Sequence, residues 1–182
     1  MVAKAKTSKT AKKGGPMGKV LHEIISARTP AEDLRPYDEA ALLRAAEDAV
    51  TAIKVHKPGT SVVRVDNASG IERLGRAVSL LTVVNDNMPF LFDSVLGELS
   101  DFGVEATLVV HPVLVVKHGK KGVDAIIGDA ASTKVGPDED KISLIHVHLP
   151  KLSDEQSGDL EPRLNARLKQ VREAVVDWKP ML

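Results

Sequence analysis

Two histidines close to the end of the chain have the spacing of metal ligands on a β-strand. His146 and His148 lie two residues apart in an apolar run, so both imidazole rings would point to the same side of a strand. His111 could join them from a neighbouring strand. No acidic residue lies beside them on the same strand, however, and the third ligand is undefined. We therefore interpret them as ordinary sheet or interface histidines and predict no metal site.

A second polar group lies between a predicted strand and a predicted helix. Residues 85–88 stop the apolar run of residues 76–84, and Asn87 is of the residue type that caps helices. Asp93 would lie in the first turn of that helix, where a carboxylate complements the positive end of the helix dipole. This role is sufficient to explain Asp93. A contact between Asp93 and an effector or a partner lysine is the alternative.

The composition excludes several kinds of site. The chain has no cysteine, which excludes disulfides, cysteine-ligated metals and cysteine nucleophiles. It contains no G-x-G-x-x-G after a strand and no P-loop, so we expect no nucleotide cradle. No apolar run approaches the roughly 20 residues that cross a bilayer, and no signal peptide is visible. We expect a cytoplasmic protein that does not contact a membrane.

Nucleic-acid binding is also a poor interpretation. Domains that bind RNA on a sheet of this kind need aromatic residues on the central strands. The predicted strands 76–84, 104–110 and 142–149 contain none. The lysine-rich residues 1–19 carry no arginine or aromatic residue, and we interpret them as a disordered, solvated basic tail.

The remaining chain divides into a helical leader, residues 20–59, and an α+β part, residues 60–182. The leader is amphipathic, so its apolar side must lie on the following part or on another subunit. From residue 76 onward the predicted order is strand, helix, several strands, helix. That order is typical of a ferredoxin-like sandwich, in which two helices cover one face of a mainly antiparallel sheet.

Three structural questions stay open at this point. Residues 61–66 either complete the sheet in place of a last strand or leave its edge open. The side of the last strand that carries Ile142, Leu144, His146 and His148 is too apolar for water, so we expect it to meet another domain or subunit. Pro162 could lie in the first turn of the last helix or kink it.

Three segments carry a resemblance to a known family. They are VVNDNMPFLFDSVLGELSDFGVEATLVVHPVLVV, ISLIHVHLPKLSDEQ and VREAVVDWKPM. Together they resemble the amino-terminal region of the large bacterial NAD-specific glutamate dehydrogenases, which looks like an ACT-type regulatory domain. The resemblance covers about residues 60–181 and implies an ACT-like sandwich.

The resemblance also implies a function. The chain would be a fragment of an enzyme that oxidises L-glutamate to 2-oxoglutarate and ammonium, with NAD bound in a distant catalytic domain. The fragment itself would be a non-catalytic regulatory or assembly domain that holds no cofactor. Its partners would be downstream domains of the same chain and further copies in a homo-oligomer.

ACT-type domains bind amino acids where the first strand meets the first helix, which suggests an amino-acid sensor as the alternative. Helix amides would hold the carboxylate of the effector, and Asp86 or Asn85 its ammonium group. The usual Pro-Gly of this loop is Pro89-Phe90 here, and a phenylalanine would fill the ligand space. We therefore favour a capped turn with Phe90 packed into a core or interface. The candidate effector or interface residues are Asn85, Asp86, Asn87, Met88, Phe90 and Asp93.

Overall fold

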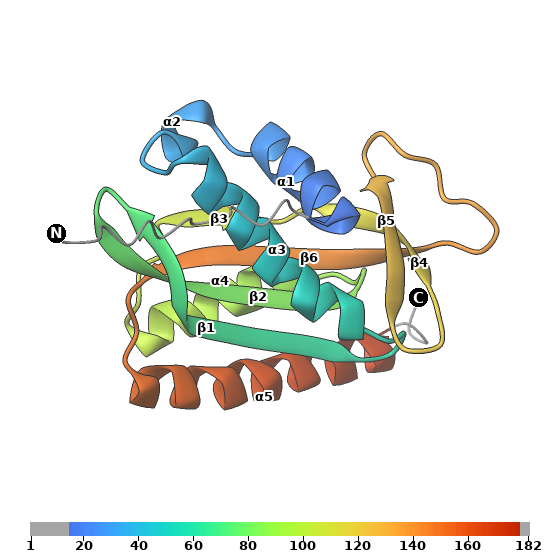
Figure 1. The fold of residues 1–182 in the computed structure, drawn as a ribbon. Helices are drawn as coiled ribbons and strands as arrows, with labels where there is room; N and C mark the ends of the chain where they lie inside the picture. Colours follow the sequence, from blue (N-terminus) through green and yellow to red (C-terminus); the bar gives the residue numbers. More distant parts are fainter. Residues whose placement is uncertain (1–14, 179–182) are drawn as a thin grey trace, which may run out of the picture.

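The computed structural model describes residues 15–178, in which one sheet has helices on both of its faces (Figure 1). Three helices come first: α1 (Pro16–Arg28), α2 (Ala31–Leu34) and α3 (Glu39–Val55). The strands are β1 (Ser61–Arg73), β2 (Arg76–Asp86), β3 (Leu108–Val110), β4 (Val113–His118), β5 (Val123–Asp129) and β6 (Asp140–Pro150). Helix α4 (Leu91–Phe102) follows β2, and α5 (Asp154–Trp178) follows β6.

The sheet is antiparallel, with the order β1-β2-β6-β4-β5, and the short β3 also pairs with β6. Strand β1 lies beside β2, so residues 61–66 do complete the sheet at the edge where a ferredoxin-like domain has its last strand. The strand is longer than predicted. The turn-forming residue types at positions 67–70 predict a turn, but these residues form a bulge between Asp66 and Ile71, and β1 continues to Arg73.

One face of the sheet packs against α4 and α5, which confirms the predicted two helices on one face. Alternate residues of β6, Ile145, Val147 and Leu149, lie in a core with the apolar sides of these helices. Glu98 of α4 is buried and forms ion pairs with Arg163 and Arg167 of α5, which hold the two helices together.

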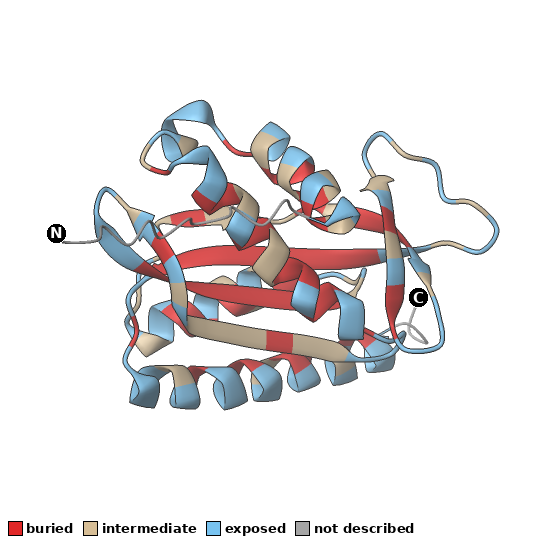
Figure 2. Ribbon diagram, viewed as in Figure 1, coloured by how far each residue is buried: buried red, intermediate tan, exposed pale blue. Residues whose placement is uncertain are grey.

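The other face is covered by the helical leader. Ile142 and Leu144 of β6 pack against α1 and α3. We had expected this face to meet another domain or subunit, but the leader of the same chain covers it. Figure 2 shows the result: β2 and β6 are buried along most of their length, while β1 at the edge is only half-buried. The leader therefore lies on the sheet of its own chain.

Four local predictions have clear outcomes. Helix α1 begins at Pro16, inside the predicted tail, and residues 1–14 lie outside the described residues. The helix predicted to begin at Asn87 begins at Leu91, because the left-handed backbone of Phe90 (φ 70°) cannot belong to an α-helix. The sequence SDEQ at residues 153–156 predicts a capping box, and the structure has both of its hydrogen bonds, between Ser153 and Gln156. Pro162 lies inside α5 and not in its first turn.

Candidate functional site

The strand-to-helix turn begins with one buried and one partly exposed polar residue. Asn85 and Asp86 are the last residues of β2, and Asn85 is 1% exposed. The Asn85 amide donates to the Ser61 hydroxyl over 2.8 Å, and the Asp86 carboxylate accepts from the Gly59 N–H over 2.9 Å. Both residues therefore tie β2 to the start of β1.

An arginine far away in the sequence completes this cluster. Arg172 of α5 donates to the Asp86 carboxylate over 2.9 Å and to the Thr60 carbonyl over 3.1 Å, and it also donates to the Asn85 side-chain oxygen. The guanidinium thus neutralises Asp86 and satisfies Asn85. Sequence reasoning missed Arg172 because nothing in the local pattern of α5 distinguishes it from the other charged residues there.

The other candidate residues of the turn do not join this cluster. Asn87 and Asp93 are exposed, and Asp93 lies in the first turn of α4 as predicted. Met88 packs partly against the core under α4. Phe90 is 61% exposed, so it is not packed into the core of this chain; its ring lies 6.5 Å from that of Trp178, edge to face.

Two histidines extend the polar cluster toward β6. His56, just after α3, is fully buried; its Nε2 lies 3.2 Å from the Thr60 carbonyl and 3.7 Å from Asp86 Oδ1. Its Nδ1 lies 3.3 Å from His118 Nε2, and His118 Nδ1 lies 2.9 Å from Asp140 Oδ2. Five side chains from separate elements thus form a line from α5 to β6: Arg172, Asp86, His56, His118 and Asp140.

The protons of the histidine pair can be counted from these contacts. A carbonyl and an ionised carboxylate only accept hydrogen bonds, so both outer nitrogens, His56 Nε2 and His118 Nδ1, must carry a proton. The contact between the inner nitrogens needs a third proton, whereas two neutral imidazoles have only two. The fully bonded pair therefore carries one positive charge, and loss of the proton leaves one bond unmade.

The surroundings of His56 act on its charge in both directions. Burial lowers the pKa of His56, while the Asp86 carboxylate and the Thr60 carbonyl raise it; His118 and Arg172 lower it further. Because burial is the largest of these effects, the pKa of His56 is lowered overall, and the neutral form of His56 is favoured. Within the described residues, no three histidine, aspartate or glutamate side chains are placed to hold a metal ion.

His146 and His148 occupy the centre of the sheet under the leader. The His146 Nδ1 contacts the Thr82 hydroxyl at 3.1 Å, and the two Nε2 atoms are 3.2 Å apart. Burial lowers the pKa of His146 to about 4; burial and the neighbouring His146 lower that of His148 to about 2. His111 does not join them, because it stacks on Phe92 of α4.

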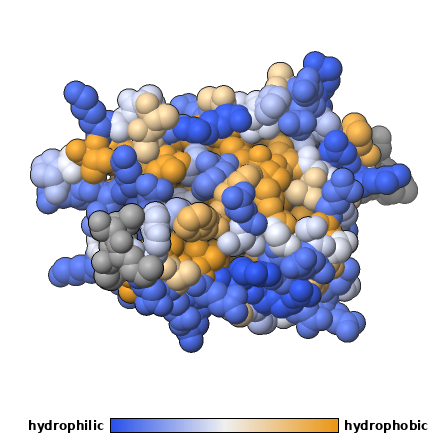
Figure 3. Space-filling model, turned by 180° about the vertical axis from the view of Figure 1, so that it is seen from behind, coloured by the Kyte–Doolittle hydropathy of each residue, from blue (hydrophilic) through white to orange (hydrophobic). Residues whose placement is uncertain are grey.

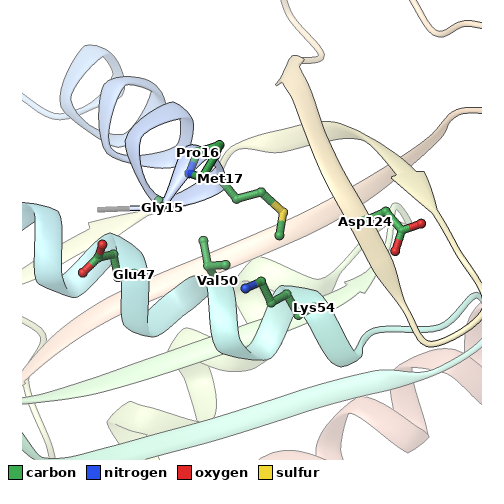
Figure 4. A pocket seen from close by; sticks show the side chains of 8 residues that line it. Gly15, Pro16, Met17, Glu47, Val50, Lys54 and Asp124 are labelled. Atoms are coloured by element: carbon green, nitrogen blue, oxygen red, sulfur yellow. The ribbon is translucent and has the colours of Figure 1, made fainter. Parts of the chain in front are cut away.

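A cavity of about 330 Å³ opens between the start of α1, α3 and β5 (Figure 4). Lys54 lines it together with two acidic residues, Glu47 and Asp124, and Met17 extends across it. Charges of both signs favour no particular class of ligand, and the chain preceding Gly15 at its rim lies outside the described residues.

Comparison with known proteins gives one match. Residues 22–164 match the family described as "Glutamate dehydrogenase, ACT1 domain". Neither the curated proteins nor the solved structures give a match. Among the helices of residues 15–178, none combines the length and apolar character that crossing a membrane requires.

Proposed function

Since the chain belongs to the glutamate dehydrogenase ACT1 domain family, we propose that it is a non-catalytic regulatory and assembly domain of an NAD-specific glutamate dehydrogenase. The parent enzyme would convert L-glutamate to 2-oxoglutarate and ammonium in the cytoplasm, with NAD bound in another domain. The match includes most of the leader as well as the sheet, so both belong to the domain that we propose.

The exposed pair of Phe90 and Trp178 carries this proposal. These residues are 61% and 46% exposed, and aromatic residues are frequent anchors of protein interfaces. Phe90 also holds a left-handed backbone, which costs an L-residue about 1–2 kcal/mol. Leu74 is also exposed and has a positive φ (50°), so strain alone does not distinguish Phe90; its position beside the exposed ring of Trp178 does.

The location of this pair suggests where a partner would bind. Both faces of the sheet are covered by helices of the same chain, so a partner would contact helix ends and loops. Figure 3 shows apolar side chains exposed on the face opposite to the leader, above the hydrophilic outer side of α5. A downstream domain or a second copy of the chain would bury Phe90 and Trp178 together.

The test uses the dehydrogenase chain that contains this domain. Phe90→Ser should weaken assembly by about tenfold or more, measured as the concentration dependence of the mass by light scattering. Leu74→Ser is the matched control, because Leu74 is 73% exposed in the β1–β2 turn, far from Phe90. Equal behaviour of both variants, or reduction of NAD by residues 1–182 alone with glutamate, would contradict the proposal.

An amino-acid sensor at residues 85–88 stays the alternative. Asp86 is paired with Arg172 and Gly59, so the ammonium group of an effector would have to compete with the guanidinium. Titration calorimetry of the chain with a panel of amino acids separates the two proposals. Heat of binding that is lost in Asp86→Asn would favour the sensor.

A further inference from the structure

A basic cavity lies at the end of the sheet opposite to the turn after β2. Its volume is about 430 Å³, and it is formed where the β1–β2 hairpin, the segment before β3 and the end of β6 meet, near the left end of the sheet in Figure 1. Three cationic side chains line it: Arg73, Arg76 and Lys151. The rest of the lining is Ala77, Val78, Thr107, Leu149 and Pro150.

These three cations have no acidic partner among residues 15–178. Arg73 and Arg76 are direct partners in the β1–β2 register, and like charges in that position destabilise a sheet. Lys151 donates to the Asn67 carbonyl, which leaves its charge uncompensated. The hairpin therefore keeps a local excess of positive charge.

One unused hydrogen-bond donor belongs to a residue that lines this cavity. Arg73 Nε is buried and has no hydrogen-bond partner in the described part of the chain. The same holds for the Tyr37 hydroxyl and His148 Nδ1, whose rings contact edge to face at 5.0 Å. Neither Tyr37 nor His148 lines the cavity, although Thr107 of its wall donates its N–H to the His148 carbonyl over 2.9 Å.

The pKa of Tyr37 depends on the nearby charge of Arg73. Burial raises the pKa of Tyr37, the Thr107 hydroxyl and the Arg73 guanidinium lower it, and the Asp33 carboxylate raises it again, so the pKa is raised overall. Buried polar atoms normally find a partner, so the unsatisfied Arg73 Nε, beside two further cations without an acidic partner, points to a missing anion. An arginine pair in this arrangement can hold carboxylate or phosphate oxygens with directed hydrogen bonds.

We propose that this cavity binds a small organic anion, in which a carboxylate or phosphate group is attached to an apolar body. Arg73 and Arg76 would hold the anionic group, with Lys151 at the rim. The apolar body would lie on Val78 and Leu149, which form part of the wall. This site is separate from the turn after β2 and does not depend on the function of the domain in the dehydrogenase.

The test is titration calorimetry of the whole chain with inorganic phosphate, acetate and pentanoate at constant ionic strength. Phosphate and carboxylate arms distinguish the two anionic groups. Pentanoate should bind about fivefold or more tightly than acetate, because its chain buries apolar surface. The Arg73 Nε–H signal in NMR spectra should shift on binding. Equal affinity for acetate and pentanoate would overturn the assignment of an apolar body.

Variants distinguish binding in this cavity from a general electrostatic attraction of anions to the chain. Arg73→Gln combined with Arg76→Gln should weaken binding about tenfold or more. Lys57→Gln combined with Lys117→Gln removes the same charge from exposed positions outside the cavity and should leave the affinity unchanged. Arg76→Gln alone, at an exposed position, should weaken binding if the double variant does not fold. Equal weakening by both double variants, or no binding of any probe, would overturn the proposal.

Discussion

At the scale of single residues, Arg172 forms hydrogen bonds with the polar side chains at the end of β2. It donates to Asn85 and Asp86, which a ligand would otherwise have to satisfy, and to the Thr60 carbonyl. The contacts join α5 to the end of β2 and to the residue before β1, and Arg172 and Asp86 lie 86 positions apart in the sequence. The turn is thus stabilised by the chain itself.

Replacing Arg172 should measure this contribution. Arg172→Ala should lower the free energy of unfolding by about 1–2 kcal/mol, since hydrogen bonds to charged groups are partly weakened by solvent here. Lys169→Ala on the same helix removes an exposed pair with Glu173 and should cost less than about 0.5 kcal/mol. Urea unfolding measures both. Similar losses in the two variants would show that the Arg172 contacts add nothing beyond a surface ion pair.

The buried histidines should make stability depend on pH. The folded chain holds the pKa of His146 at about 4 and that of His148 at about 2, below the ordinary 6.5, so the unfolded chain binds these protons first. Above pH 6.5 both histidines are neutral in the folded and in the unfolded chain. As the pH falls below 6.5, the free energy of unfolding decreases by roughly 1.4 kcal/mol per pH unit for each histidine.

A single substitution tests how much one of these histidines contributes to the pH dependence of stability. His148→Leu keeps an apolar side chain under the leader and should reduce the loss of stability between pH 6.5 and pH 5.0 by about 2 kcal/mol. Urea unfolding of both proteins at the two pH values gives the difference. An unchanged pH dependence would mean that His148 binds its proton in the folded chain as easily as in the unfolded one.

At the scale of elements, the start of α4 is set by backbone conformation and not by a capping side chain. Phe90 occupies the N-cap position with a left-handed backbone, and it makes no side-chain cap hydrogen bond. The four residues from Asn87 to Phe90 therefore form a loop in front of the helix, and the helix cannot extend toward Asn87.

The strain at Phe90 can be separated from the loss of its ring. Phe90→Gly removes the ring and the strain, whereas Phe90→Ala removes the ring alone. The glycine variant should therefore be more stable than the alanine variant by about 1 kcal/mol, measured by thermal or urea unfolding. Equal stability would show that the left-handed conformation at this position costs nothing.

At the scale of the whole molecule, the leader is part of the fold. Its helices α1 and α3 supply Leu21, Ala49 and Ile53 to a core that also contains Leu114 and Leu144 of the sheet. A second core joins the end of the hairpin to Tyr37 and the first turn of α3. Two of the three apolar cores in the described residues therefore need the leader.

Removal of the leader should consequently unfold the rest of the chain. The fragment of residues 60–182 would expose the apolar residues of β6 together with His146 and His148. We expect no cooperative unfolding transition and strong binding of a hydrophobic dye, compared with the intact chain under the same conditions. A cooperative transition like that of the intact chain would show that residues 60–182 fold alone.

The amino-acid sequence by itself determined the elements and their order. Periodicity located α3, β2, α4, β6 and α5, and the capping box at Ser153 has the predicted contacts. These signals are local, because a residue and its neighbours within one or two turns decide helix, strand and cap. The order of elements then restricted the fold to a ferredoxin-like sheet.

Only the tertiary structure decided what lies on each face and which polar residues meet. The sequence left the leader free to cover its own sheet or another subunit, because an amphipathic helix specifies an apolar partner but not its identity. It also contained no sign that Arg172 contacts Asp86 or that His56 contacts His118. Such contacts join residues 62 and 86 positions apart, and they exist only because sheet pairing and helix packing bring these positions together.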